Sequence, residues 1–383
     1  MVMNCWSSTL RALSSRLAIA ALVLPMAVCS AARAADTTEL EMVQSITTPD
    51  LEGVVNVAIS KSGDYVYAAS SAKRAISVFK RDPETGQLTP IAPARGFGPF
   101  RVRVSSDDQY VEIADPNGGV VAIYQREAAT GALKLAAKIV NSPDVPGGLT
   151  LVNDAHLSPD DHFLYTASIN GLGVFKFENN ELTFVQFEPG EGNLAGLRRF
   201  ALSPDGHWLY APACIAGALS VFRRDEATGK LDPFQTIHDG DDGITSISGA
   251  HRLSVSSDGR QVYVSSGRFG GVQAISAFEV QGDGKLKLLQ EFINGKDDFS
   301  EFEGGNEVQA SPDGKWVFAV ASLSDRLFRF SRDPATGKLT FIDSQQAGNF
   351  AAPGAASVCA SYDGKFVYVA DDKEGAIEVF KLP

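Results

Sequence analysis

A repeat of about 50 residues, present seven times, constrains this chain more than any other feature. Each copy contains an apolar segment, a turn that begins with Ser, an aromatic-rich segment, and a third segment that ends near Phe or Tyr. In most copies a second turn and a fourth segment follow. The fourth residues of the first turns are 45 to 55 residues apart, at Gly63, Asp108, Asp161, Gly206, Gly259, Gly314 and Gly364. Four short strands per unit at this period predict an all-β fold, a seven-bladed β-propeller of four-stranded antiparallel blades.

The two ends of the repeat array predict how the ring closes. The last copy stops at Pro383, directly after its third segment. Residues 39–46 resemble the fourth segment of another copy, at residues 181–186. We therefore expect the N-terminal strand to complete the last blade. This closure would remove an open sheet edge, which otherwise invites aggregation.

Residues 1–34 have the features of a secretory signal peptide. Arg11 and Arg16 form a basic n-region, residues 17–28 form an apolar stretch, and residues 32–34 offer a cleavage site. The apolar stretch is too short for a typical transmembrane helix, so a retained anchor is the weaker alternative. The prediction is a signal peptide at 1–34 and a single propeller at 35–383. We expect a periplasmic or secreted protein that is not inserted in the membrane after cleavage.

Charge and cysteine content exclude several classes of protein. The formal net charge of −12 becomes −15 without Arg11, Arg16 and Arg33, which argues against nucleic acid as a partner. Only Cys214 and Cys359 lie beyond the signal peptide, which is too few for a disulfide framework. No Cys or His spacing indicates a zinc site, and we predict no organic cofactor.

One hypothesis of a bound ion stays open. An acidic loop at residues 239–243 and the pair Asp297 and Asp298 fall in two successive long connections. Carboxylate oxygens are the ligands that calcium prefers. The spacing of an EF-hand loop is absent, so a pair of solvated loops is the competing interpretation.

Strand alternation predicts which side chains face the central channel. Counting back from the Ser of each first turn, the residues one and three positions earlier are all apolar, which indicates a packed face. Side chains alternate along a strand, so the residues two and four positions earlier should face the channel. The second position includes Arg103 and His156. The fourth position is polar in every copy: Asn56, Arg101, Asp154, Arg199, Arg252, Glu307 and Ser357.

These positions predict a basic funnel that binds a small carboxylated or phosphorylated anion. Arginine presents planar, bidentate donors to such groups, and a funnel of one sign attracts ligands of the other. We predict Arg101, Arg103, Arg199, Arg252 and Asn56 as ligand-binding residues. The competing interpretation is that the charged side chains only pair with one another.

Acid–base chemistry has three candidates in the same funnel. Asp154 and His156 are two positions apart on one strand face. If they pair, the carboxylate would orient the imidazole and raise its basicity, as in a general base. Glu307 is the reserve acid or base. We therefore predict His156, Asp154 and Glu307 as catalytic residues and give His251, on the packed face of its strand, less weight.

The repeat motifs resemble those of a known family. The motif SPDG(R/K)xxYV, a third segment of ISVF type and the turn (R)DPxTGxLT resemble the seven-bladed lactonase family across residues 39–383. That group includes 6-phosphogluconolactonase-like and carboxymuconate-cyclase-like proteins and is close to the YVTN-repeat propellers. The resemblance implies a lactone hydrolase or cycloisomerase with a small lactone as its substrate.

One family motif is altered in this chain. The resemblance implies a catalytic Arg-His pair before the turn of blade four and a Glu after the next strand. The corresponding residues are Arg198, Arg199 and Cys214, so the His and the Glu are replaced. A noncatalytic propeller that binds a protein or a ligand in the cell envelope is therefore the alternative function.

Overall fold

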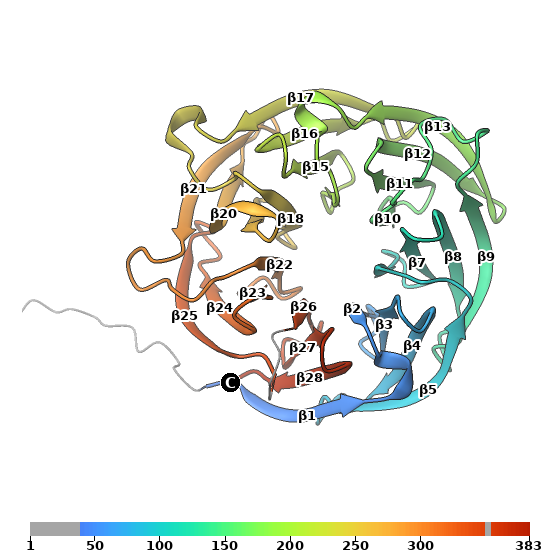
Figure 1. Ribbon diagram of the computed structural model, residues 1–383, viewed down its shortest axis with the longest axis horizontal. Coiled ribbons are helices and arrows are strands. Elements are labelled where there is room, and N and C mark those ends of the chain that lie inside the picture. Colours follow the sequence, from blue (N-terminus) through green and yellow to red (C-terminus); the bar gives the residue numbers. More distant parts are fainter. Residues whose placement is uncertain (1–38, 349–353) are drawn as a thin grey trace, which may run out of the picture. The chain divides into compact units, whose positions relative to one another are not determined.

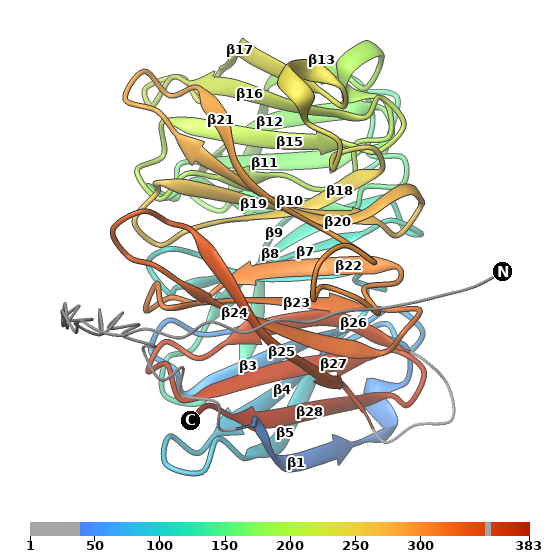
Figure 2. The same cartoon turned by 90° about the vertical axis from the view of Figure 1, so that its left-hand side faces the viewer.

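The computed structural model describes residues 39–348 and 354–383. Their strands form seven four-stranded antiparallel sheets, which follow one another around a central channel (Figure 1). Figure 2 shows the ring from the side, with the strands crossing its thickness. The predicted seven-bladed propeller is confirmed.

The first three blades contain twelve consecutive strands, ordered from the channel outward. Blade 1 consists of β2 (Val54–Ile59), β3 (Tyr65–Ser70), β4 (Ala75–Arg81) and β5 (Leu88–Arg95). Blade 2 consists of β6 (Arg101–Val104), β7 (Tyr110–Asp115), β8 (Val120–Arg126) and β9 (Leu133–Val140). Blade 3 consists of β10 (Asp154–Leu157), β11 (Phe163–Ser168), β12 (Gly171–Glu178) and β13 (Glu181–Pro189).

The next three blades repeat this order. Blade 4 consists of β14 (Ala201–Leu202), β15 (Trp208–Ala213), β16 (Ala218–Arg224) and β17 (Leu231–His238). Blade 5 consists of β18 (Ala250–Val255), β19 (Gln261–Gly267), β20 (Gly270–Val280) and β21 (Leu286–Ile293). Blade 6 consists of β22 (Gly305–Ala310), β23 (Trp316–Ala321), β24 (Arg326–Arg332) and β25 (Leu339–Gln346). Three short 3-10 helices lie in connections between blades: η1 (Pro49–Leu51), η2 (Gly192–Leu194) and η3 (Asp241–Gly243).

Blade 7 joins the two ends of the chain. It consists of β26 (Ala355–Ala360), β27 (Phe366–Asp371), β28 (Ala376–Lys381) and, as its outer strand, β1 (Glu41–Thr47). β1 pairs antiparallel with β28 from Glu41 opposite Lys381 to Thr47 opposite Ala376 (Figure 1). The N-terminal strand therefore completes the last blade, as predicted.

The predicted signal peptide at residues 1–34 lies outside the described residues. Within residues 39–348 and 354–383, no helix is long and apolar enough to cross a membrane.

The first turn of each blade is held by the Ser that marks the repeat. In blade 3, Ser158 Oγ donates to Asp160 and accepts the Phe163 backbone N–H at 3.0 Å. Asp161 completes this turn with φ 58°, a left-handed conformation that glycine supplies in five of the blades. The turn therefore fixes where the inner strand ends, and with it the strand face that meets the channel.

Apolar side chains pack between neighbouring blades. At some of these interfaces, which we call seams, an arginine of one blade also bonds to a Tyr and an Asp of the preceding blade, an arrangement that we call an arginine clasp. Arg224, the last residue of β16, donates from Nε to the Tyr165 hydroxyl (2.7 Å) and from Nη2 to Asp160 (2.7 Å), both on the preceding blade. Arg81 with Tyr368 and Asp363, and Arg332 with Tyr263 and Asp258, repeat this arrangement. Between blades 2 and 3, Glu112 and Phe177 take the positions of the Tyr and the Arg. A buried carboxylate therefore replaces a clasp at that seam.

Candidate functional site

Two arginines meet one carboxylate in the middle of the channel. Glu307 on β22 accepts from Arg101 Nη1 on β6 (2.9 Å) and from Arg252 Nη1 on β18 (2.5 Å). Blades 2 and 6 lie on different sides of the ring, so this bridge crosses the channel. Burial raises the pKa of Glu307, but the arginines, led by Arg101 and Arg252, lower it to about 2. The carboxylate is therefore ionised and held by its partners.

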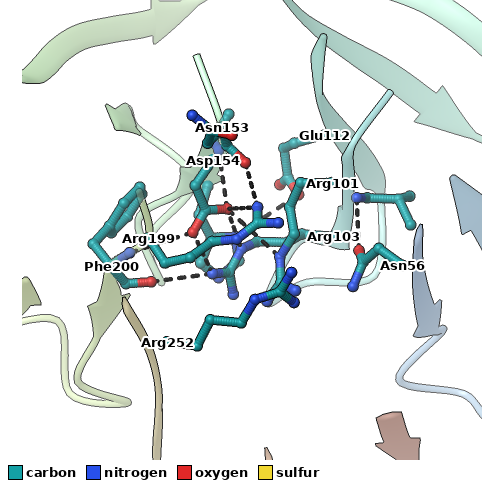
Figure 3. Close-up of polar contacts among 12 residues, drawn as sticks. Asn56, Arg101, Arg103, Glu112, Asn153, Asp154, Arg199, Phe200 and Arg252 are labelled. Carbon is teal, nitrogen blue, oxygen red and sulfur yellow. Dashed lines mark hydrogen bonds and ion pairs between the residues drawn. The ribbon is translucent and has the colours of Figure 1, made fainter. Parts of the chain in front are cut away.

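Asp154 contacts three arginines, one of which, Arg101, also binds Glu307. Arg103 donates from Nε (3.0 Å) and Nη2 (2.8 Å) to its two oxygens, while Arg101 Nε and Arg199 Nη1 lie 3.6 and 4.0 Å from Oδ1 (Figure 3). Burial raises the pKa of Asp154, but Arg103, Arg101 and Arg199 hold it well below its usual value. The charged residues of the funnel thus pair with one another, as the competing interpretation expected.

His156 does not have the partner that its spacing suggested. Asp154 is bound by Arg103, and the nearest carboxylate to His156 Nδ1 is Glu112, with Oε2 at 3.8 Å. Neither Glu112 oxygen nor His156 Nδ1 has a hydrogen-bond partner within the described residues. Sequence reasoning missed Glu112 because it lies on β7, the second strand. The sequence feature that could have indicated Glu112 is that it occupies a repeat position where five other blades carry Tyr.

The bridge of Arg101, Glu307 and Arg252 lies between two cavities. The turn-side cavity, at the end of the channel where the inner strands finish, has a volume of about 250 Å³. The mouth cavity, where these strands begin, has a volume of about 280 Å³. Asn56, Arg101, Arg103, His156 and Glu307 line the turn-side cavity, while Arg199 and Arg252 line the mouth cavity. The predicted site residues therefore do not share one pocket.

The mouth cavity is lined by residues that strand alternation assigned to the packed face. The register of β18 shifts between Ala250 and Arg252, and β2, β22 and β26 shift at the same place. A bulge leaves one residue unpaired and reverses the alternation on one side of it. In these four blades the bulge turns the residue five positions before the turn Ser toward the mouth, whereas in blades 2, 3 and 4 that residue precedes the inner strand. The residue at this position lines the mouth in every blade: Val55, Phe100, Asn153, Arg198, His251, Asn306 and Ala356.

Two further arginines add positive charge to the mouth cavity. Arg198 lies with its guanidinium carbon 4.2 Å from the ring centre of Phe269, and its buried Nε has no hydrogen-bond partner within the described residues. Arg268 donates from Nη1 to Ser322 Oγ at 2.5 Å. The ion pairs found in the described part of the chain include neither arginine, whereas Arg199 and Arg252 have carboxylate partners.

One carboxylate and one imidazole also line the mouth cavity. Burial raises the pKa of Asp372 above its usual value, against the lowering effects of Lys373 and Arg268. Burial, followed by Arg252, holds the pKa of His251 well below its usual value, so that this imidazole is neutral. Both nitrogens of His251 are buried, and its ring lies edge-on to Phe269, with 5.1 Å between the ring centres. Asp372 is thus the accessible acid–base group of the mouth.

Sequence reasoning missed Arg268, Phe269 and Asp372 because they lie in hairpins between second and third strands. Such hairpins return to the end of the channel where the inner strands begin, since neighbouring strands are antiparallel. This rule of strand topology could have indicated from the sequence that these three residues lie near the mouth of the channel.

The altered family positions have structural partners. Cys214 Sγ donates to the Gly196 carbonyl at 3.2 Å. Arg199 Nη1 donates to the Asn153 carbonyl. Neither side chain is placed as a free acid or base.

The acidic loops do not form a ready metal centre. No group of three or more His, Cys, Asp or Glu side chains within residues 39–348 and 354–383 is arranged to hold a metal ion. Asp239 Oδ1 instead accepts the backbone N–H groups of Ile247 and Ser248, at 3.1 and 3.0 Å. Asp241 accepts the His238 N–H at 2.8 Å.

Comparison with known proteins identifies relatives over most of the chain. The family model described as "Lactonase, 7-bladed beta-propeller" matches residues 26–147, 148–244 and 272–383. A 6-phosphogluconolactonase of Bacillus subtilis is 24% identical over 301 residues, which cover 75% of this chain and 82% of the relative.

Solved structures share the fold at low identity. The periplasmic gluconolactonase of Pseudomonas aeruginosa superposes with a TM-score of 0.62 at 23% identity, over 77% of this chain and 85% of that one. The hydrazine synthase of Kuenenia stuttgartiensis has a TM-score of 0.64 at 17% identity, over 88% and 97%. Identities this low establish the fold and leave the chemistry to the residues of the site.

Proposed function

The chain belongs to the seven-bladed β-propeller lactonase family, and on that basis we propose that it hydrolyses a small lactone that carries a carboxylate or phosphate group. We place the reaction in the mouth cavity. The pattern of residues 1–34 and the periplasmic location of the Pseudomonas aeruginosa relative support a location outside the cytoplasm.

The observation that carries this proposal is the charge of the mouth. Arg198 and Arg268 line a cavity of about 280 Å³ without ion-pair partners within the described residues, beside the paired Arg199 and Arg252. The lining holds these four arginines against one carboxylate, that of Asp372, so the cavity attracts an anion and can bind it through charge-assisted hydrogen bonds. A neutral lactone would leave these charges unbalanced.

The same cavity supplies groups for hydrolysis. Asp372 takes a proton from water as the water oxygen attacks the lactone carbonyl carbon. The guanidinium of Arg268 or Arg252 stabilises the oxyanion that forms on the carbonyl oxygen. The ring C–O bond then breaks, and the proton on Asp372 passes to the departing ring oxygen, which yields the open hydroxy acid. His156, Asp154 and Glu307 have no part in this scheme, because the last two are bound by arginines and His156 lines the other cavity.

Purified protein with phosphorylated, carboxylated and uncharged sugar lactones tests this proposal. Acid release above the spontaneous rate is expected for the charged lactones. Asp372→Asn should lower kcat by about 10²-fold or more with a small change in KM, as expected for loss of a general base. Glu374→Gln, the same acid-to-amide change at an exposed residue of the same hairpin, is the matched control. Hydrolysis of none of the lactones, or full activity in Asp372→Asn, would refute the scheme.

A noncatalytic binding propeller is the second candidate function. It is favoured by the two altered family positions, where Cys214 and Arg199 are hydrogen-bonded to backbone carbonyls. Anion binding at the mouth without turnover of any lactone would select this function.

A further inference from the structure

Four consecutive blades carry a large exposed apolar residue at the same place. The hairpins between the second and third strands of blades 3, 4, 5 and 6 present these residues, which we call the apolar crescent: Ile169, Ile215, Phe269 and Leu323, exposed by 45%, 79%, 53% and 56%. The same hairpins in blades 7, 1 and 2 expose polar or charged residues, among them Lys373, Arg74 and Asn117. The crescent therefore covers one side of the ring only.

The crescent lies at the mouth end of the channel. Phe269 lines the mouth cavity directly, and the equivalent hairpins of the other blades end on the same face. Ile169, Ile215 and Leu323 are outside the lining of that cavity. A small molecule that fills the mouth thus leaves most of the crescent uncovered. Exposed apolar groups gathered on one face mark a surface for a macromolecular partner.

The hairpins that carry the crescent are held in place before any partner binds. The backbone N–H of Leu323 donates to the Glu303 carbonyl (3.0 Å), and that of Ile215 donates to the Ala195 carbonyl (3.2 Å). A methyl group at Gly304 would lie 2.5 Å from Leu323 Cγ, so the incoming loop and the hairpin tip are in close contact. A surface fixed in this way loses little conformational entropy on binding.

The loops beside the crescent carry a net negative charge, although Arg326 pairs with one of their acids, Glu301. Residues 239–249 and 294–304 enter blades 5 and 6 from the same end of the channel. Lys296 is the only Lys or Arg in these loops. Their exposed carboxylates belong to Asp239, Asp241, Asp242, Asp297, Asp298, Glu301 and Glu303. Complementary charge around an apolar centre guides association and sets its orientation.

We propose that the apolar crescent and its acidic loops form a docking surface for a protein whose contact face has apolar residues bordered by Lys or Arg. Such a partner would place its apolar residues on Ile169, Ile215, Phe269 and Leu323 and its basic residues against the loops at 239–249 and 294–304. Docking there would also cover the mouth cavity through Phe269. This inference is independent of lactone hydrolysis.

A random peptide library displayed against the full folded protein tests the surface. Enriched peptides should combine large apolar residues with Lys or Arg. Their affinity should fall about tenfold or more in Ile215→Asp and in Leu323→Asp, a loss typical of a central contact residue. Asp297→Asn with Asp298→Asn should reduce binding and its salt dependence. Leu135→Asp, at an exposed residue of the outer strand β9, is the matched control, and melting curves verify that each variant is folded.

Several outcomes would overturn the proposal. The proposal fails if the enriched peptides are acidic, or if they bind the crescent variants as tightly as they bind the parent protein. It also fails if no peptide is enriched. Another such outcome is self-association of the parent protein that Ile215→Asp abolishes, which would assign the surface to a second copy of this chain. Binding to phosphatidylcholine or phosphatidylglycerol vesicles that is lost in Leu323→Asp would assign it to a lipid surface.

Discussion

Glu307 on β22 and Arg101 on β6 are 206 positions apart in the chain, yet the Arg101 Nη1 atom lies 2.9 Å from Glu307 Oε2 inside the channel. The same oxygen accepts from Arg252, so one buried carboxylate pairs with two guanidinium groups contributed by different blades. This bridge separates the mouth cavity from the turn-side cavity.

Removal of the Glu307 charge should destabilise the ring strongly. Glu307→Gln leaves Arg101 and Arg252 buried with a weaker acceptor, and breaking a buried ion pair from one side costs about 3–5 kcal/mol. The unfolding free energy or the melting temperature measures this loss. Glu178→Gln, which removes an exposed pair with Lys176, should change little. Equal stability of Glu307→Gln and the parent protein would contradict the bridge.

Acid should weaken the fold through the same carboxylate. The pKa of Glu307 falls from 4.5 to about 2 on folding, because its arginine partners outweigh the effect of burial. The folded protein then binds fewer protons at this site, so the contribution is complete above pH 4.5 and is lost as the pH falls to about 2. Melting temperatures measured across this window should decrease, and the decrease should be smaller in Glu307→Gln. Parallel pH profiles for the two proteins would argue against this source of acid sensitivity.

Asp161 should have the opposite dependence on pH. Burial, followed by Asp107 and Glu112, raises its pKa from 3.8 to about 7. Asp161 therefore favours the folded state in its protonated form, and stability decreases as the pH rises from 3.8 through about 7. Asp161→Gly removes the charge at a turn position with φ 58° that suits glycine. Its melting temperature should exceed that of the parent protein by more in alkaline than in acidic buffer.

Asp108 offers a matched control for this substitution. It occupies the same turn position in blade 2 with φ 65°, but its carboxylate pairs with Arg126 and accepts the Lys61 N–H at 2.8 Å. Asp108→Gly should therefore lower the melting temperature. An equal gain in both variants would show that backbone conformation, and not charge, sets the result.

Anion binding should distinguish the two cavities. Phosphate or citrate at millimolar concentration should raise the melting temperature, because a ligand that binds only the folded state stabilises it. Arg268→Gln and Arg198→Gln should each weaken the apparent affinity by about tenfold, the scale of one lost charge-assisted hydrogen bond. High salt should weaken it further.

The turn-side residue His156 provides the control for that measurement. His156→Ala should leave anion binding unchanged, because the imidazole lines the turn-side cavity while Arg198 and Arg268 line the mouth. Loss of anion binding in His156→Ala with full binding in Arg268→Gln would move the ligand to the other end of the channel.

The seven repeats and the four strands per blade could be predicted because they depend on local periodicity. The closure of blade 7 by β1 could be predicted because the last copy lacks a fourth segment and the N-terminal residues resemble one. Turn residues such as Ser158 and Asp161 act within a few positions of the chain, and side-chain alternation is a property of any strand. The same alternation predicted that Glu307 faces the channel, and Glu307 lines the turn-side cavity.

The candidate site required the tertiary structure. The bulge at His251 depends on how β18 pairs with β19, so the chain alone does not reveal that position five faces the mouth. The pairing of Asp154 with Arg103, and not His156, depends on distances between blades. Arg268 and Asp372 come to one cavity from blades 5 and 7 only because the ring closes. Local sequence thus determines the blades, whereas the packing of side chains from distant repeats determines which charges are balanced and which are left to bind a ligand.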